Sequence, residues 1–222
     1  YGCISFNGNK IITGSSGGMF LTDSKEDADK VRKWSTQSRE DAFWYQHEEI
    51  GYNYRMSNIV AGIGRGQLLH LDEHIAKKKA IRKRYEEAFA DIPEIALNPV
   101  HTNEKEKTEA NYWLTCMTFT RDAVFSGSIT PDRIMDALAE ENIESRPIWK
   151  PLHLQPVFRE CDFITTTNEE AKGASRIEDG KAANRTYSVS EDIFLRGLCL
   201  PSDIKNTPED MELIISTMRR VL

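Results

Sequence analysis

A helical pattern that runs from Ser57 to about Asp91 is the feature that most constrains this chain. Apolar residues recur along it at the spacing of one helix face, among them Ile59, Ile63, Leu71, Ile75, Tyr85 and Phe89. Pro93 and Pro99 end the pattern, and the charged stretch that follows indicates an exposed connection into a new module. The sequence therefore predicts two domains, residues 1–100 and residues 101–222.

Strand-like segments precede the helical pattern. Residues 2–6 and 18–22 predict two short strands, which are joined by a polar, glycine-rich loop at residues 7–17. Asp23 or Ser24 can cap a helix that follows the second strand. We therefore expect a pair of strands, a loop between them and a helix at the start of the chain.

Strands and helices also alternate in the second half. A predicted strand at residues 112–120 is followed by a helix that Thr130 caps and by a strand at residues 143–146. Residues 198–200 predict another strand. The last helix begins after Thr207 and has one apolar stripe, formed by Met211, Ile214, Ile215, Met218 and Val221. This order predicts a small α/β domain.

Composition narrows the class of protein. The chain has 222 residues, 39% of them hydrophobic, and a net charge of −6, which gives no support to nucleic-acid binding. No apolar run approaches the roughly 20 residues that span a bilayer, so we expect a cytoplasmic protein with no membrane partner. The four cysteines are scattered without a CxxC pair, and we expect reduced, buried packing residues at Cys3, Cys116, Cys161 and Cys199.

The segment SFNGNKIITGSSGGM, residues 5–19, holds one lysine among glycine, asparagine and serine residues, between two predicted strands. A lysine on such a turn is partly desolvated, which favours the neutral amine that a Schiff base requires. On the residues alone, an exposed loop lysine is the simpler interpretation of Lys10. His70 and His74 lie four residues apart on the long helical pattern, but no third ligand accompanies them, so we expect no metal site.

This lysine segment resembles the cofactor-lysine segment of the pyridoxal-phosphate (PLP) sugar-nucleotide aminotransferases of fold type I, the DegT-type family. The resemblance implies that Lys10 forms the Schiff base with PLP. EIGYNYRMSNIVAGIGRGQL, residues 49–68, is similar to the loop and helix with which this family reaches the partner subunit's cofactor phosphate. Asn53 matches that phosphate role, and Arg55 is a second candidate.

A third segment, ESRPIWKPLHLQPVF at residues 144–158, resembles the substrate-side loop of the same family. Within the family, its sequence is most similar to the bacillosamine-type branch. The resemblance implies that Trp149 and His153 contact the sugar nucleotide, and that Arg146 or Lys150 meets its diphosphate. Packing is an equally good interpretation of Trp149. The implied fold is the end of the large PLP domain at residues 1–100, followed by the small C-terminal α/β domain.

The resemblance implies transfer of an amino group, usually from glutamate, to a nucleotide-linked keto-sugar in a homodimer with shared active sites. The expected substrate is a UDP-linked 4-keto-6-deoxy-N-acetylhexosamine, and the product serves glycan or polysaccharide assembly. A 3-keto-sugar or cyclitol aminotransferase is one alternative. A non-catalytic relative that acts in dimerisation or sugar-ligand binding is another.

Members of this family are longer than 222 residues, and the chain opens at Tyr1 directly into a strand-like segment. We therefore expect a C-terminal part of a longer enzyme, without the upstream groups that contact the pyridine nitrogen, stack on the ring and hold most of the phosphate. The chain alone is then expected to be inactive and to bind PLP weakly or not at all.

Overall fold

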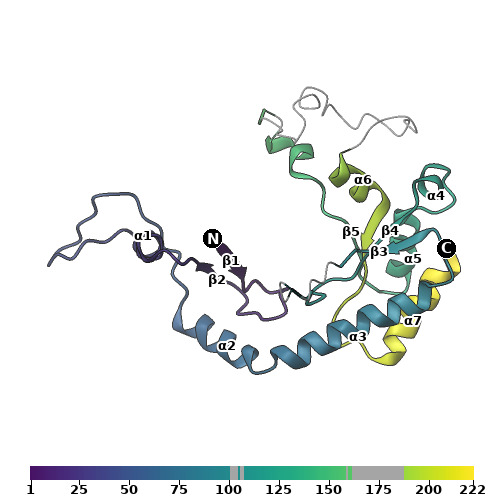
Figure 1. Cartoon of the computed structure of the whole chain (residues 1–222), viewed down its shortest axis with the longest axis horizontal. Helices are drawn as coiled ribbons and strands as arrows, with labels where there is room; N and C mark the ends of the chain where they lie inside the picture. The colour runs from purple at the N-terminus through teal and green to yellow at the C-terminus, as the bar shows by residue number, and fades with distance from the viewer. Residues whose placement is uncertain (101–104, 106–107, 159, 162–187) are drawn as a thin grey trace. The chain divides into compact units, whose positions relative to one another are not determined.

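The computed structural model describes residues 1–100, 105, 108–158, 160–161 and 188–222. These residues form two compact units, Tyr1–Lys77 and Lys78–Leu222, each of which is described by itself (Figure 1). None of the helices formed by the described residues is long and apolar enough to cross a membrane.

The first unit begins with an antiparallel pair of strands, β1 (Gly2–Ser5) and β2 (Gly18–Leu21). Helix α1 (Lys25–Ser35) follows, and its N-cap Ser24 accepts a hydrogen bond from the backbone N–H of Asp27, as the sequence predicts. Helix α2 (Asn58–Leu68) begins after a second serine cap, Ser57. The predicted hairpin and capped helix are therefore present.

The loop between β1 and β2 is held closely against the start of α2. The backbone N–H of Gly14 donates to the Phe6 carbonyl at 3.0 Å, and a Cβ added at Gly14 would lie 2.8 Å from Val60 Cγ1. Gly17 has a φ of +93°, and a Cβ there would lie 2.8 Å from Met56 Cε. Glycine at these two positions permits the close approach and the left-handed backbone.

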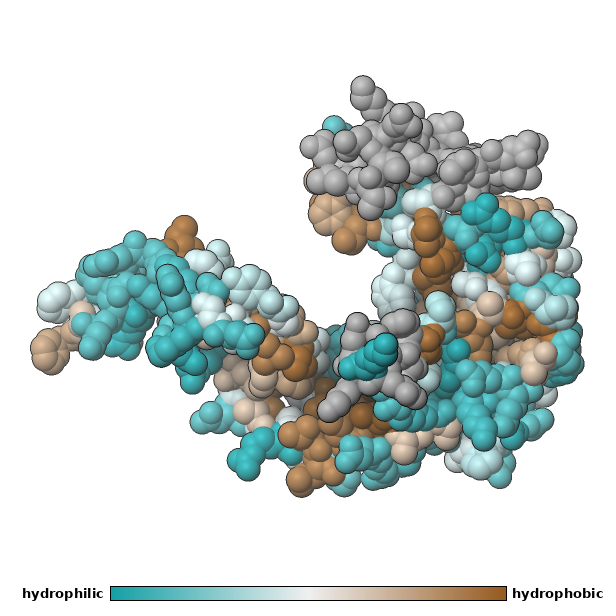
Figure 2. Space-filling model, viewed as in Figure 1, coloured by the Kyte–Doolittle hydropathy of each residue, from teal (hydrophilic) through white to brown (hydrophobic). Residues whose placement is uncertain are grey.

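Hydrophobic side chains of the first unit remain on its surface. Among residues 1–77, all of which the structure describes, no hydrophobic residue is buried. On α2 and just after it, large apolar side chains are exposed, and Figure 2 shows hydrophobic surface over this region. They are Ile59, Ile63, Leu68 and Leu69, with exposed fractions between 49% and 86%. The unit is therefore held by hydrogen bonds, helix caps and close backbone contacts, without a buried hydrophobic core.

The single long helix expected from Ser57 to Asp91 is wrong, because the chain turns at Leu69 and His70 between α2 and α3 (Leu71–Phe89). The backbone N–H of His70 donates to the Gln67 carbonyl at 3.0 Å, three residues back. Such a bond tightens a last turn and ends the regular ladder. Three glycines in α2 also lower the stability of a continuous helix there.

The second unit contains a four-stranded antiparallel sheet in the order β3-β4-β6-β5. Its strands are β3 (Ile95–Leu97), β4 (Cys116–Phe119), β5 (Arg146–Pro147) and β6 (Gly197–Cys199). Strands β4 and β5 both run antiparallel to β6, so they are parallel to each other, as the predicted strand-helix-strand unit requires. Strand β3 was not predicted, β4 and β5 are shorter than expected, and β6 has the expected length but begins one residue earlier.

Five helical segments follow β4 in the described part of this unit besides the final helix. Helices α4 (Arg121–Phe125) and α5 (Pro131–Glu140) connect β4 to β5, and Thr130 caps α5 as predicted. Two short 3-10 helices, η1 (Leu152–Leu154) and η2 (Pro156–Phe158), follow β5. Helix α6 (Val189–Arg196), which was not predicted, leads directly into β6.

The core of this unit lies between the sheet and the helices α3, α5 and α7 (Pro208–Val221). Four of the five residues of the predicted stripe on α7 are buried, and Val221 packs beside them half-buried. Figure 1 shows α7 beside the second half of α3, where Arg219 pairs with Asp91 and Arg84 with Glu212. The predicted apolar stripe of α7 is therefore confirmed.

The division between the two packing units falls within α3. Tyr85 is fully buried and donates its hydroxyl hydrogen to the Pro201 carbonyl at 2.7 Å, and Phe89 is 4% exposed. The second half of α3 thus belongs to the core of the second unit. The assignment of residues 1–100 to a larger domain stays a prediction.

The expectation that all four cysteines are buried is wrong. Only Cys199 is buried, at 7% exposed, whereas Cys116 is half-buried and Cys3 and Cys161 are exposed. Cys3 lies on the two-stranded sheet of the first unit, which has no buried hydrophobic residues to enclose it. All four are free thiols.

We expect Gly14→Ala to disturb the loop between β1 and β2, because the new Cβ would overlap Val60 and force the loop away from α2. Overpacking of this kind costs about 1–3 kcal/mol. Hydrogen exchange should show lower protection of the loop amides. The matched control is Gly8→Ala in the same loop, where an added Cβ meets nothing within 4 Å. Equal protection in both variants would contradict the contact.

Asp192 gives the second unit an acid-sensitive contact. Asp192 is 8% exposed, and its carboxylate accepts hydrogen bonds from Arg196 and Arg121. These two arginines, Arg196 most of all, hold the pKa of Asp192 below its usual 3.8. Since the folded pKa is lowered, the contribution to stability is full above 3.8 and is lost as the pH falls through the folded value.

Asp192→Asn is therefore expected to lower the free energy of unfolding at neutral pH by about 2 kcal/mol, a typical value for hydrogen bonds to a charged group. The difference from the unsubstituted chain should shrink as the solution is acidified below the usual pKa. Denaturant unfolding of both proteins across a pH series measures this difference in the free energy of unfolding. Asp136→Asn, at an exposed position on α5, is the control and should change little. A difference that stays constant with pH would contradict this account.

Candidate functional site

Lys10 lies on a bend of the loop between β1 and β2. Its backbone N–H donates to the Asn7 carbonyl at 3.0 Å, and its side chain is half-buried. The loop closes on itself because the N–H of Phe6 donates to the Gly17 carbonyl at 3.0 Å. With the glycine contacts to α2, these bonds fix the backbone that carries the lysine, so the structure places the predicted lysine on an ordered, half-buried turn.

His74, at the first turns of α3, holds the residue that follows Lys10. Its Nδ1 donates to the Ile11 carbonyl at 3.1 Å, because a carbonyl oxygen can only accept. His74 and His70 also stack, with ring centroids 6.1 Å apart. His74 is therefore half-buried against the lysine loop. A contact between residues 63 positions apart leaves no local pattern in the sequence.

Asn53 and Arg55 lie on the loop before α2, and both are exposed. Asn53 forms an isolated antiparallel bridge with Thr36, and the N–H of Tyr54 donates to the Ser35 carbonyl at 3.0 Å. These bonds attach the loop to the C-terminal end of α1. The positions of both side chains are thus set by backbone pairing, and their polar groups remain accessible.

A carboxylate strengthens this attachment. Glu49 accepts hydrogen bonds from Lys30 at 2.7 Å and from Trp34 Nε1 at 3.1 Å, and Lys33 lies 3.2 Å away. The Lys30 hydrogen bond, followed by those of Trp34 and Lys33, lowers the pKa of Glu49 to about 2. The loop before α2 therefore stays tied to α1 by an ionised carboxylate throughout the neutral range.

Arg55 borders a cavity of about 810 Å³ within the first unit. Most of the other lining residues are apolar or aromatic and come from β2, α1 and the loop before α2; they include Met19, Phe20, Val31, Trp34, Tyr52 and Met56. Lys10 and Asn53 are not part of this lining. The cavity therefore involves only one of the three residues predicted to hold a cofactor.

Three of the predicted substrate residues are exposed on the segment that begins with β5. Arg146 pairs with Glu144, and Lys150 lies next to Trp149, whose side chain is 61% exposed. The ring of Trp149 lies 6.2 Å from that of Trp113, at an angle of 34°. Trp113, which precedes β4, was not among the predicted site residues, because only the fold brings it next to Trp149. The pair offers an accessible aromatic surface beside two cationic side chains.

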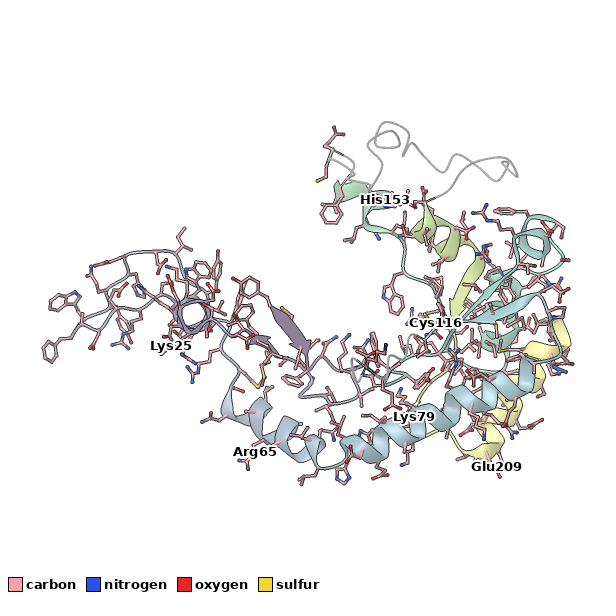
Figure 3. The ribbon with its side chains drawn as sticks, viewed as in Figure 1. Lys25, Arg65, Lys79, Cys116, His153 and Glu209 are labelled. Carbon is pink, nitrogen blue, oxygen red and sulfur yellow. The ribbon has the colours of Figure 1, made fainter. Side chains whose placement is uncertain are left out.

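His153 lies apart from these three. It sits on η1, and Figure 3 shows it next to the start of α6. Its Nε2 is 3.6 Å from Glu191 Oε1, and the two side chains are 11% and 6% exposed. Glu191 also accepts a hydrogen bond from the backbone N–H of Ser188 at 2.8 Å, which completes a capping box. The structure thus places His153 against a buried carboxylate.

Several of these residues fit an anionic, aldehyde-bearing cofactor such as PLP. Lys10 supplies an amine on a fixed turn, while Asn53 and Arg55 supply an amide and a guanidinium just before the capped start of α2. No group of three or more His, Cys, Asp or Glu side chains within the described residues could hold a metal ion. The donor set therefore suits a phosphate ester and a carbonyl group.

Comparisons with known proteins agree with the fold. A putative sugar aminotransferase, Spr1654 from Streptococcus pneumoniae in its PMP form, superimposes with a TM-score of 0.74, at 20% identity over 99% of this chain and 52% of that chain. The aminotransferase TlmJ from Streptoalloteichus hindustanus gives a TM-score of 0.75, at 19% identity over 99% of this chain and 51% of that chain. The predicted α/β fold, as part of an aminotransferase fold, is confirmed.

Curated relatives give the same result from the sequence. The putative pyridoxal phosphate-dependent aminotransferase EpsN of Bacillus subtilis (strain 168) is 40% identical over 98% of this chain and 49% of its own length. GDP-perosamine synthase of Caulobacter vibrioides is 29% identical over 98% of this chain and 51% of its own length. The chain thus spans about half the length of the curated relatives it matches.

The sequence profile of the DegT/DnrJ/EryC1/StrS aminotransferase family matches residues 1–219. This match covers nearly the whole chain and includes both units. The chain belongs to the DegT/DnrJ/EryC1/StrS aminotransferase family.

Proposed function

We propose that this chain supplies the lysine-bearing part of a PLP-dependent enzyme that transfers an amino group to a nucleotide-linked keto-sugar. The observation that carries the proposal is Lys10 on its half-buried turn, held by glycine contacts to α2 and by His74. A catalytic lysine must keep one position while its amine changes partners. A turn fixed from two sides meets that requirement.

Lys10, Asn53 and Arg55 are the residues of this chain that we assign to the cofactor. When bound, PLP supplies an electron sink that stabilises negative charge at a substrate carbon. The amine of Lys10 would hold the cofactor and, when free, would move a proton to or from the substrate carbon. The amide of Asn53 and the guanidinium of Arg55 bind phosphate oxygens, and a partner subunit's cofactor is the expected recipient.

Arg146, Trp149 and Lys150 form the proposed substrate-binding segment. Arg146 and Lys150 provide positive charge for a diphosphate, and Trp149 with Trp113 provides an aromatic surface for a base or a sugar ring. His153 is a weaker candidate, because its imidazole already faces Glu191 and is 11% exposed. A contact between His153 and the sugar stays a prediction.

The proposed acceptor is a UDP-linked 4-keto-6-deoxy-N-acetylhexosamine, with glutamate as the amino donor and a cytoplasmic homodimer as the active form. The names of relatives support the broader class: GDP-perosamine synthases are among them, as is SpsC of Bacillus subtilis, a spore coat polysaccharide biosynthesis protein. Competition between UDP- and GDP-linked keto-sugars, and between 3-keto and 4-keto forms, separates the alternatives within the family.

The proposal is tested by borohydride trapping. The 222-residue chain alone is expected to give no pyridoxyl label, since the polar groups that it offers to the cofactor are few. The chain is then produced together with the half of Bacillus subtilis EpsN that it does not match, and assembly is verified by size-exclusion chromatography. In the assembled complex, reduction with borohydride should place the label on Lys10, as peptide mapping detects.

Lys10→Arg should abolish the label and lower amino transfer by at least about 10²-fold, the smallest effect expected of a general acid-base group. Lys25→Arg, at an exposed position on α1, is the matched control and should keep both the label on Lys10 and the rate of amino transfer. An assembled complex without label at saturating PLP would overturn the aminotransferase proposal. It would leave the alternative of a non-catalytic dimerisation or sugar-binding relative.

A further inference from the structure

Two thiols lie side by side in the sheet of the second unit. Cys116 on β4 and Cys199 on β6 are directly paired residues of neighbouring antiparallel strands, and their Sγ atoms are 3.6 Å apart. Figure 3 marks Cys116 within this sheet. The pair lies outside the residues assigned above to cofactor and substrate, and the family assignment gives it no role.

The strand register places the pair where a disulfide is geometrically accessible. The N–H of Leu200 donates to the Thr115 carbonyl at 2.9 Å, so the next pair along, Cys116 and Cys199, is a non-hydrogen-bonded pair. Opposite Cα atoms in such a pair are about 4.5 Å apart, at the lower end of the range found in disulfides, about 4.4–6.8 Å. Bond formation requires the sulfurs to approach to about 2.05 Å without any change of register.

The two thiols differ in reactivity. Cys116 is half-buried, whereas Cys199 is 7% exposed. The hydrogen bond from Cys199 and the charge of Arg82 lower the pKa of the Cys116 thiol, while the same hydrogen bond and burial raise the pKa of Cys199. The thiolate is the attacking species in disulfide exchange. Cys116 is therefore the attacking residue and Cys199 the resolving residue.

We propose that Cys116 and Cys199 are a reversible thiol-disulfide modification site that reacts with small-molecule disulfides such as glutathione disulfide. The Cys116 thiolate attacks one sulfur, forms a mixed disulfide and releases one glutathione thiolate. Cys199 loses its proton to the released thiolate, attacks Cys116 Sγ and releases the second glutathione. The protein loses two electrons and two protons, and one glutathione disulfide becomes two glutathione thiols.

The modification reaches the proposed substrate-binding segment through Cys199. Cys199 Sγ lies 3.6 Å from Cys116 Sγ and 3.9 Å from the Pro147 carbonyl, and its single S–H hydrogen is shared between these two acceptors. Arg146 is the direct strand partner of Cys199 on the other side of β6. A disulfide has no S–H, so oxidation removes this donor from β5. Strand β5 has only two residues and pairs with β6 alone among the described strands. Loss of the contact is therefore expected to loosen β5 and the residues just after it.

The test uses the full chain with Cys3→Ser and Cys161→Ser, which removes the two exposed thiols and leaves only the pair. After treatment with glutathione disulfide, intact mass spectrometry should show loss of two hydrogens, and a peptide map without reductant should link Cys116 to Cys199. Dithiothreitol should restore both thiols. The same background with Cys116→Ala is the control and cannot form the link.

Other outcomes would overturn the proposal. Two thiols that stay free in the folded protein, or one glutathione on each cysteine, would show that the pair does not close. Hydrogen exchange of residues 143–150 decides the effect on β5, with faster exchange expected after oxidation and unchanged exchange in treated Cys116→Ala. A linked pair with unchanged exchange in this segment would remove the coupling to substrate binding.

Discussion

Among the described residues, only the second unit buries hydrophobic side chains, and this difference determines which interactions hold each unit together. There, α3, α5 and α7 enclose a core with the sheet, and Tyr85 anchors α3 by both packing and a hydrogen bond to Pro201. Residues 1–77, all described, contain no buried hydrophobic residue. Their structure depends on helix caps, strand pairing and close glycine contacts, and a single cap or hydrogen bond contributes about 0.5–2 kcal/mol.

This contrast places the predicted reactive lysine on locally ordered backbone. Lys10 sits on a turn whose neighbours are tied to α2 and to His74. Among the proposed substrate residues, Arg146 lies on a strand of two residues at the edge of a sheet with a packed core, and Trp149 and Lys150 follow this strand. The residues proposed for cofactor and substrate therefore lie on short polar elements in both units.

Local chemistry explains which elements could be predicted from the sequence. Ser24, Thr130 and Thr207 mark helix starts by side-chain capping, and all three caps are present. The turn at Leu69 and His70 has no proline and no polar cap. The hydrophobic periodicity continues across it, and a single helix was therefore predicted there. Strand β3 has only three residues and is stabilised by its pairing with β4. Because β4 lies about 20 residues later in the chain, the sequence around β3 alone did not predict the strand.

The same distinction applies to the site. Lys10, Asn53 and Arg55 lie in segments that resemble family motifs. The resemblance indicated which residues to consider, but it did not indicate which residues contact them. His74 and Trp113 act through partners distant in the chain, so the sequence offered no signal for them. The surroundings of His153 were not predicted either. The motif around His153 indicated a substrate contact. In the structure His153 lies against Glu191, a residue of helix α6, which was not predicted.

The carboxylate of Glu191 serves two elements of the second unit at once. Its Oε2 accepts from the backbone N–H of Ser188 and caps α6, while its Oε1 lies 3.6 Å from His153 Nε2 on η1. A substitution of Glu191 therefore disturbs the start of α6 and the position of η1 together, whereas a substitution of His153 leaves the capping box of α6 in place.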